Sequence, residues 1–394
     1  MSLMQEAAVA VGAGELEHAL EQYRRPLTGY CYRMLGSPFE AEDAVQETLL
    51  RAWRGFDNFE GRAALRSWLF RIATNVCLDM VKSRERRALP VDFGPAQEPI
   101  EANLHTRPEV TWIQPIPDSA LLAAGDPADT AVAHETIRLA FVAALQHLPP
   151  RQRAVLILCE VLRWKATEVA ELLDTTVASV NSALQRARAT LEASRLSVDD
   201  TAATIDEAQR ELLTRYVDAF QRYDLDALTS LIQRDAKQCM PPYDMWLSGR
   251  DDILAWWFGP GIGCRGSLLI PTVGANGSVA FGQYKPSESG SGHDPWALQV
   301  IEMKDGRIAD FVFFLNGLPI ATLEVKHEAW QARAERLRGW ADAVRNWRGR
   351  KLPYTAGVLD VWMLLLLADH LGASDVLGAG VVVRCVADWL RGLK

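Results

Sequence analysis

The sequence predicts a multidomain protein in which two all-α domains precede an α+β domain and a helical C-terminal tail. At 394 residues the chain is too long for one ordinary hydrophobic core. Two stretches with helical apolar spacing, about 15–88 and 131–196, flank a segment rich in proline and acidic residues. From residue 205 helical patterning gives way to short strand-like runs, which is the order of an α+β domain.

The composition, with 49% hydrophobic and 23% charged residues, is typical of a soluble globular protein. The net charge of −8 argues against a uniformly basic nucleic-acid binder, although a local basic face would still bind phosphates. The six cysteines are scattered without metal-site spacing, which indicates reduced thiols in a cytoplasmic protein. We find no signal-peptide pattern and no apolar run long enough for a bilayer, and we expect no metal, cofactor or membrane contact.

The first helical domain follows an N-terminus of 14 residues that we expect to be disordered. Apolar residues recur on one face of its first helix, namely Leu16, Leu20, Tyr23 and Leu27. Ser37-Pro38 ends this helix and begins a second, Phe39 to Phe56. Gly61 separates a third, from Ala63 to about Arg87.

The second helix of this domain carries a polar face formed by Asp43, Gln46 and Glu47. Taken alone, such a face is more often simply solvated. The next helix changes the interpretation because it mixes apolar positions with polar and basic residues, namely Arg66, Arg71, Asn75, Lys82, Arg84, Arg86 and Arg87. Aromatic residues accompany them, namely Trp53, Phe56, Phe59 and Trp68. Cations for phosphates and aromatic faces for unstacked bases are what a melted DNA strand requires.

Residues 32–87, from YRMLGSPFEAEDAVQE to VKSRERR, resemble region 2 of the sigma-70 family in its extracytoplasmic-function branch. The resemblance implies that the polar face formed by Asp43, Gln46 and Glu47 docks on the clamp of core RNA polymerase. It also implies that Gly61 to Trp68 and the helix after it, with the aromatic and basic residues named above, capture the −10 promoter element with one base flipped into a pocket.

The spacing of helices in the second helical domain predicts a helix-turn-helix. A helix from Leu148 to about Leu162 precedes two more, Ala166 to Leu173 and Val177 to Ala193, with Asp174 in the turn where glycine is common. The segment from ALQHLPPRQR to RARATL resembles sigma region 4, which implies binding to the polymerase flap and to the −35 element. The residues that would serve this surface are Arg151, Arg153, Thr176, Ser179, Asn181, Ser182, Gln185, Arg186 and Arg188.

Residues 89–130 form an acidic, proline-rich linker between the two helical domains. Two interpretations stay open: a plain flexible tether, or a segment that occupies the channels of the polymerase. The stretch from Val110 to Asp118 is unusually apolar for a tether, so we expect it to dock on another part of the protein.

After a polar bridge at 197–204, residues 205–319 resemble the SnoaL-like domain, a cone-shaped α+β barrel around a pocket. Four side chains with possible acid or base roles show no spacing that forms a dyad, namely Asp244, Asp251, His293 and Asp310. A ligand pocket would be lined by apolar and aromatic residues that could equally form a packed core, namely Met240, Tyr243, Trp246, Trp256, Trp257 and Phe281. We expect a regulatory domain and not an enzyme, acting on the sigma domains directly or through a small molecule.

Residues 320–394 continue beyond the resemblance as a predicted helical tail to which the sequence assigns no role. The predicted protein is a sigma factor that binds core polymerase and initiates transcription from promoters with −35 and −10 elements. One alternative is a ligand-responsive helix-turn-helix regulator that does not bind core polymerase. Another is an enzyme of the SnoaL-like class fused to a DNA-binding module.

Overall fold

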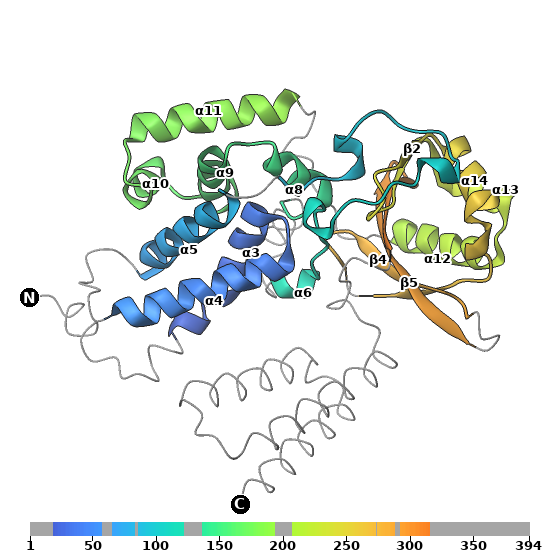
Figure 1. The fold of residues 1–394 in the computed structure, drawn as a ribbon, viewed down its shortest axis with the longest axis horizontal. Coiled ribbons are helices and arrows are strands. Elements are labelled where there is room, and N and C mark those ends of the chain that lie inside the picture. Colours follow the sequence, from blue (N-terminus) through green and yellow to red (C-terminus); the bar gives the residue numbers. More distant parts are fainter. Residues whose placement is uncertain are drawn as a thin grey trace, which may run out of the picture. The chain divides into compact units, whose positions relative to one another are not determined.

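The computed structural model describes residues 19–56, 65–82, 86–121, 136–193, 207–272, 274–287 and 292–315. All described residues belong to one compact unit. The predicted disordered N-terminus, the polar bridge at 197–204 and the helical tail at 320–394 therefore lie outside the described residues. Figure 1 shows the described elements and labels many of them as in the text below.

Three helices form the first helical domain: α3 (Arg24–Leu35), α4 (Pro38–Gly55) and α5 (Leu65–Val81). Gly36 closes α3 with a left-handed φ of 74°, which lets its N–H donate to the carbonyl of Tyr32. The Ser37 hydroxyl then accepts from the Glu40 N–H and caps α4. Pro38 fits the first turn of α4 because an N–H there would have no helical partner. The break predicted at Ser37-Pro38 is confirmed.

The second helical domain contains α8 (Leu139–Gln146), α9 (Pro150–Leu156), the π-helical turn η5 (Ile157–Val161), α10 (Ala166–Leu172) and α11 (Val177–Ala193). Between α10 and α11, Asp174 has a φ of 50°. Aspartate tolerates this left-handed region better than most residues, as the sequence interpretation required. Val180, Ala187 and Leu191 pack inward from α11 while its opposite face meets solvent. The predicted helix-turn-helix is confirmed.

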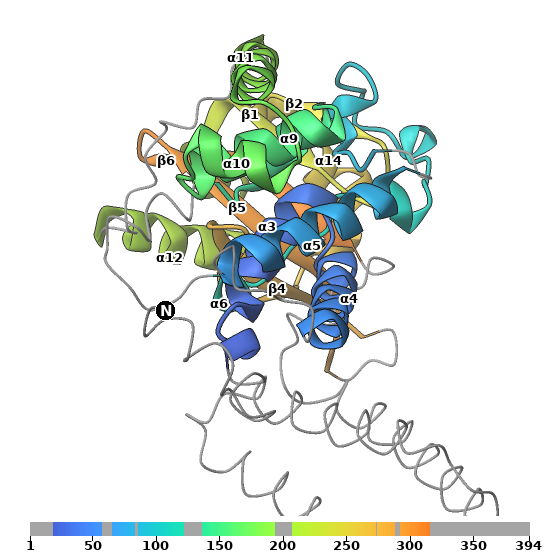
Figure 2. The ribbon, with the colours of Figure 1, turned by 90° about the vertical axis from the view of Figure 1, so that its left-hand side faces the viewer.

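Helix α8 is apolar and almost entirely buried, with the sequence LAFVAALQ. A helix without a polar face cannot lie at a surface, so it must be covered on several sides. Helix α3 of the first helical domain contacts both α8 and α9, and α5 contacts α9 and α10 (Figures 1 and 2). The two helical domains therefore pack directly against each other.

The α+β domain begins with α12 (Glu207–Arg222) and α13 (Leu225–Leu231) and includes α14 (Arg250–Phe258) and the 3-10 turn η6 (Pro260–Cys264). Its six strands are β1 (Ile232–Cys239), β2 (Trp246–Ser248), β3 (Leu268–Pro271), β4 (Val279–Pro286), β5 (His293–Lys304) and β6 (Arg307–Leu315). They form one sheet in the order β2-β1-β6-β5-β4-β3. Strands β1 and β6 run parallel and the other neighbours are antiparallel.

Two strands and a helix of this domain were not predicted. Strand β1 reads IQRDAKQC, in which polar residues dominate and alternation is weak, although Ala236 and Gln238 are buried. Strand β2 has only three residues, and α14 follows it directly. The four strand-like runs predicted between 267 and 315 correspond to β3, β4, β5 and β6.

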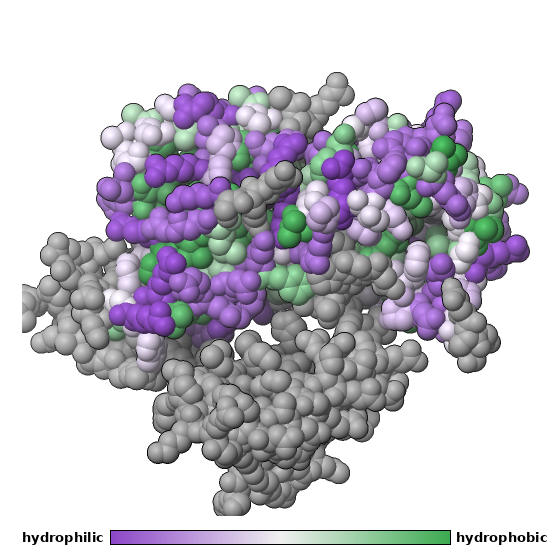
Figure 3. Space-filling model, viewed as in Figure 1, coloured by the Kyte–Doolittle hydropathy of each residue, from purple (hydrophilic) through white to green (hydrophobic). Residues whose placement is uncertain are grey.

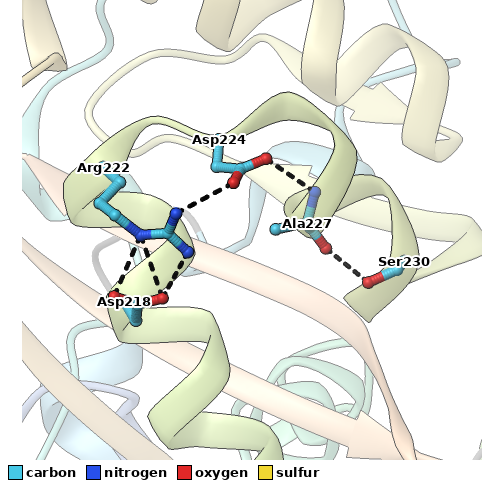
Figure 4. A network of polar contacts seen from close by, with 5 residues as sticks. All are labelled: Asp218, Arg222, Asp224, Ala227 and Ser230. Carbon is cyan, nitrogen blue, oxygen red and sulfur yellow. Dashed lines mark hydrogen bonds and ion pairs between the residues drawn. The ribbon is translucent and has the colours of Figure 1, made fainter.

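The corner between α12 and α13 is fixed by local charge pairs, as Figure 4 shows. Arg222 donates to Asp218, one turn earlier, and to Asp224 at 3.2 Å. The other oxygen of Asp224 accepts from the Ala227 N–H at 3.0 Å and caps α13. This corner places Tyr216 and Phe220 of α12 over one face of the sheet, against Phe281, Phe311 and Trp257.

The segment between the helical domains is folded along much of its length. It contains the short helices η2 (Pro90–Asp92), η3 (Glu101–Asn103), η4 (Glu109–Thr111) and α6 (Asp118–Leu121). Its main chain bonds to the α+β domain at several points, including Gln97 to Trp246, Arg107 to Pro242 and Asp118 to Gly274. Trp112, Ile113 and Ile116 are buried, so the apolar stretch that we expected to dock does so.

The second face of the sheet is covered by the helical part of the protein. Ala280, Leu298, Val300 and Phe314 belong to the same hydrophobic cluster as the cores of both helical domains and the linker. Figure 2 shows α3 and α5 in front of the strands in this region. The sheet is therefore buried on one face by its own helices and on the other by the rest of the unit.

Candidate nucleic-acid interface

The predicted polymerase-binding face lies on the solvent side of α4. Asp43 and Gln46 are exposed and Glu47 is half-buried, whereas Ala44, Val45 and Thr48 of the same helix are buried. Gln46 donates to Glu42 at 3.2 Å, and Arg51 pairs with Glu47 at 2.6 Å. The face is thus an acidic row held in place by contacts along one helix.

The aromatic part of the predicted −10 surface lies at the C-terminal end of α4 and the start of α5. Trp53 is 46% exposed, which is unusual for so large an apolar side chain. Phe56 and Trp68 are half-buried, and their ring centroids lie 6.5 Å apart. Phe59 and Arg84 lie outside the described residues. The described aromatics could stack with unpaired bases, as the resemblance implies.

The polar and basic part of the same surface follows α5, where Arg66, Arg71, Asn75 and Lys82 are exposed. Lys82 pairs with Asp79 at 2.6 Å, which lowers the pKa of that carboxyl through the hydrogen bond and the charge of the ammonium. Figure 3 shows the helical part as mainly hydrophilic on the face drawn, with small hydrophobic patches between the polar rows.

Two of these arginines contact the second helical domain. The Arg66 guanidinium lies 4.6 Å from the ring centroid of Trp164, whose ring also lies 5.3 Å from Phe70. Arg71 Nη2 donates to the main-chain carbonyl of Glu171 at 2.7 Å. Sequence reasoning did not identify Trp164, because nothing in the pattern shows that its ring faces α5. Cations suited to DNA phosphates are engaged within the protein itself.

Arg87 and Arg153 do not lie on a DNA-binding surface in this structure, contrary to expectation. Each is 4% exposed. Arg87 pairs with Glu40 at 3.0 Å and donates to the Trp112 carbonyl at 2.6 Å. Arg153 donates to the Met34 carbonyl and to the side chain and carbonyl of Gln146. A guanidinium has five N–H donors, so a buried arginine can satisfy several carbonyls at chain ends. Arg87 thus links α4 to the linker, and Arg153 links α9 to α3 and α8.

Arg86, in contrast, is exposed and bonds to the His147 imidazole, which also contacts Asp92 at 2.8 Å.

The predicted −35 surface lies on the outer face of α11. Apart from the buried Arg153, its members are exposed, namely Arg151 at the start of α9, Thr176, Ser179, Asn181, Ser182, Gln185, Arg186 and Arg188. The Thr176 hydroxyl caps α11 by accepting from the Ser179 N–H at 3.1 Å. Arg188 pairs with Glu160 of η5. A polar face on the second helix of a helix-turn-helix is suited to the major groove.

The side chains proposed for a ligand pocket are part of a packed core. Met240, Trp256, Trp257 and Phe281 are buried, and Tyr243 is partly buried against the same cluster. The half-buried Trp246 donates from its indole to the Gly94 carbonyl of the linker at 2.9 Å. Of the two sequence interpretations, the packed core is the one that the structure shows.

A chain of amides and hydroxyls runs through the inside of the α+β domain. Tyr216 donates to Gln299 at 2.7 Å, Gln299 to Gln283 at 2.8 Å, and Gln283 to Ser267 at 3.1 Å. On the same side of the sheet, Trp257 donates to Gln238 at 2.7 Å. None of these groups is a strong acid or base at neutral pH.

The four candidate acids and bases are dispersed. Asp244 pairs with Arg107 of the linker at 3.0 Å, and Asp251 is 91% exposed. His293 contacts the Gly266 carbonyl at the end of the sheet. Asp310 lines a groove of about 380 Å³ with Gln233, Asp235, Lys237, Lys304, Asp305 and Ala309. Burial, and then repulsion from Glu302, raise the pKa of Asp310 to about 6. Each of the four candidates thus has its contacts in a different place, and they do not meet one another in a shared acid–base site.

Two further observations concern the described residues only. They contain no cluster of three or more His, Cys, Asp or Glu that could hold a metal ion. No described helix is both long enough and apolar enough to cross a membrane.

An acidic helix face, an aromatic and basic second surface and a helix-turn-helix in this order define a promoter-recognition factor of the sigma-70 class. Comparison with known families agrees. Residues 19–87 match Sigma-70 region 2, residues 138–191 match Sigma-70 region 4, and residues 213–311 match the SnoaL-like domain.

The chain is 43% identical over 314 residues to the ECF RNA polymerase sigma factor SigG of Mycobacterium tuberculosis, spanning 77% of this chain and 82% of SigG. SigW of Bacillus subtilis is 28% identical over 169 residues, or 43% of this chain and 82% of SigW. The chain belongs to the ECF family of RNA polymerase sigma factors, which depend on core polymerase. The competing interpretation, a regulator independent of polymerase, leaves the region 2 match unexplained.

The crystal structure of the M. tuberculosis extracytoplasmic function sigma factor SigJ has the same fold. The TM-score is 0.50 at 22% sequence identity, and the match covers 76% of this chain and 96% of SigJ. The predicted fold class, helical sigma domains followed by a SnoaL-like α+β domain, is confirmed.

Proposed function

We propose that this sigma factor, in the cytoplasm, docks on core polymerase through Asp43, Gln46 and Glu47 and reads its promoter through two separate surfaces. The −10 surface consists of the aromatic and polar residues that α4 and α5 expose, together with Arg86. The −35 surface is the outer face of α11 together with Arg151. The exposure of these residues on two helical domains in the family's order supports the proposal.

We also propose that the structure is a closed state of the sigma factor, maintained by the α+β domain. The supporting observation is that Arg66 and Arg71 of the −10 surface contact Trp164 and Glu171 of the second helical domain. Elements centred near −10 and −35 are about 25 base pairs apart, roughly 85 Å at 3.4 Å per base pair. Two helical domains in contact cannot span that distance, so promoter binding requires them to separate.

The α+β domain acts in this proposal as a regulatory scaffold and not as an enzyme. The hydrogen-bonded chain in its interior consists of amides and hydroxyls, and none of Asp244, Asp251, His293 and Asp310 belongs to that chain. The α+β domain contacts the linker through main-chain hydrogen bonds. The outer face of its sheet, the one that carries Ala280, Leu298, Val300 and Phe314, contacts the cores of both helical domains. Because the α+β domain contacts the linker and both helical domains, its contacts can control how readily the two helical domains separate.

The experiment compares core binding by the wild-type chain and by Trp164→Leu, which removes the ring under Arg66 and leaves all proposed DNA-binding residues intact. Purified full-length protein is mixed with sigma-free bacterial core polymerase, and association and promoter-specific transcription are measured. We expect the variant to associate with core several-fold faster.

The matched control is Trp296→Leu. Trp296 also carries a cation over its ring, Lys285 at 3.8 Å, but it lies in the α+β domain. Faster association in both variants would indicate general loosening. Unchanged association in Trp164→Leu would show that the contact between the helical domains does not limit polymerase binding.

A further inference from the structure

Three consecutive residues immediately before α8 are each held by a different element. Arg33 of α3 donates to the Thr136 carbonyl at 3.0 Å and to its hydroxyl at 2.8 Å. Asn276, in the turn between β3 and β4, donates to the Ile137 carbonyl at 2.7 Å. Arg138 pairs with Glu302 of β5. This short segment, Thr136 to Arg138, leads into the helix-turn-helix domain, and we call it the α8 anchor.

Asn276 uses its side-chain amide, its side-chain oxygen and its main-chain N–H at this junction. Its side-chain amide donates to the Tyr32 hydroxyl at 2.6 Å as well as to the α8 anchor. Its side-chain oxygen accepts from the Ile116 N–H at 3.0 Å, and its own N–H donates to the Ile116 carbonyl at 3.1 Å. The side chain is fully buried. One residue of the α+β domain thereby joins the first helical domain, the linker and the start of the second helical domain.

Turn geometry alone does not explain this choice of residue. Asn276 has a φ of 54° and precedes Gly277 at 70°, a pair suited to a tight hairpin turn. The turn between β5 and β6 has the same geometry, with Asp305 at 50° and Gly306 at 70°. Asp305 is exposed, and it lines the groove on the outer face of the sheet. An aspartate therefore suffices for such a turn, whereas only an amide can donate to both Tyr32 and Ile137.

The contact between Arg138 and Glu302 adds an ion pair to the same junction. Arg138 Nε lies 3.3 Å from one Glu302 oxygen and Nη2 lies 2.5 Å from the other, so the pairing is two-pronged. Both side chains are half-buried. Arg138 is also the N-cap residue of α8, so the pair fixes the position at which that helix begins.

We propose that Asn276 and Glu302 are positioning residues through which the α+β domain holds the helix-turn-helix domain in the closed state. The proposal rests on the closed state proposed above and names the contact that maintains it. Losing either contact weakens the hold of the sheet on the α8 anchor, while the remaining contacts within each domain are unchanged. The second helical domain then separates from the first more often.

The test uses the full-length chain and Asn276→Gly, with Asp305→Gly as the matched control. Glycine adopts a φ near +50° without strain, so both variants keep their hairpin turns. Hydrogen–deuterium exchange is measured for α8 and for α12. Since a buried hydrogen bond stabilises by about 1 kcal/mol, we expect α8 amides to exchange about fivefold to tenfold faster in Asn276→Gly. Exchange in α12, and in both helices of Asp305→Gly, should match wild type.

Glu302→Gln provides an independent second variant, which keeps the shape of the side chain and removes its charge. At low salt we expect α8 amides of Glu302→Gln to exchange about twofold to fivefold faster than those of wild type. At high salt, which screens the ion pair, the two proteins should exchange at the same rate. Unchanged α8 exchange in both variants would overturn the proposal, as would equal acceleration in Asp305→Gly.

Association with core polymerase separates this proposal from the proposed function. Faster exchange in α8 together with faster core association supports both. Faster exchange with unchanged association overturns the role of the anchor in controlling the sigma factor. If the wild-type chain and all variants fail to bind core, the proposed function fails, and the exchange data alone decide whether the contact holds α8.

Discussion

At the scale of single residues, the arginines of the promoter-binding segments have two kinds of role that the sequence does not separate. Arg151 and Arg153 are two positions apart on α9, yet Arg151 is exposed and Arg153 is buried among main-chain carbonyls. Helical spacing places i and i+2 on different sides of a helix. Which side faces the first helical domain depends on packing between domains, and no local pattern encodes that.

We expect Arg153→Met to lower the free energy of unfolding by about 2–4 kcal/mol, because it leaves several buried carbonyls without donors. Denaturant unfolding of the full chain measures this change. Arg151→Met, its exposed neighbour, should leave stability within about 0.5 kcal/mol of wild type. Equal stabilities for the two variants would contradict the structural role of Arg153.

The raised pKa of the Asp310 carboxyl predicts that the stability of the fold depends on pH. Its pKa is raised to about 6 by burial first and by the charge of Glu302 second, whereas Lys237 and Arg138 act in the opposite direction. Because the folded state holds this proton more tightly than the unfolded chain, ionisation destabilises the fold as pH rises from about 4 to 6. Asp310→Asn should therefore be more stable than wild type at pH 7.5 by about 1–3 kcal/mol, and this difference should shrink to about a third at pH 4.5.

Thermal or denaturant unfolding at the two pH values measures this difference. Asp251→Asn is the control, since that carboxylate is 91% exposed and faces solvent. A stability difference for Asp310→Asn that does not change between the two pH values would show that Asp310 does not titrate in this range.

At the scale of elements, local signals predicted the helices well and the strands in part. Ser37-Pro38 set the start of α4, and Pro150 and Asp174 set α9 and the helix-turn-helix, since capping and turn chemistry act within a few residues. Strand β1 carried no such signal. Its buried Gln238 looks like a surface residue in the sequence, but it accepts from the Trp257 indole inside the domain.

The outer face of α11 gives a prediction for DNA binding. We expect Arg186→Ala to weaken promoter binding by the holoenzyme by about 1–3 kcal/mol, and to reduce the salt dependence by about one counterion if Arg186 contacts a phosphate. Binding titrations at several salt concentrations measure both effects. Glu192→Ala changes an exposed acid further along the same helix and should not weaken binding. A loss confined to one base pair would instead assign Arg186 to base readout.

At the scale of the whole molecule, the sequence predicted separate domains joined by a linker, whereas the structure shows one shared hydrophobic cluster. Residues from α3, from the linker at Ile113 and Ile116, and from the sheet at Val300 and Phe314 belong to it. Hydrophobic patterning shows which residues are buried but not which partner buries them. The resemblance predicted the functional surfaces of each domain, and it could not predict that two arginines of the −10 surface contact the second helical domain.

A chain ending near residue 200 tests this shared cluster. It lacks the sheet, so side chains that Leu298 and Phe314 cover become exposed. We expect this chain to bind a hydrophobic dye more strongly and to associate in light scattering, and added core polymerase should reduce both effects. A monomeric truncated chain with wild-type dye binding would show that the helical part closes its own core.

The shared cluster also has a consequence for the order of events during synthesis on the ribosome. Phe314 is the last described contributor to a core that otherwise begins at Leu27. At 5–20 residues per second, about 10 to 50 s pass between completion of the −10-binding segment and the synthesis of Phe314. During that interval the nascent promoter-binding helices lack the sheet that covers them. We therefore expect the growing chain to need protection by chaperones, or early capture by core polymerase, until the last strand emerges.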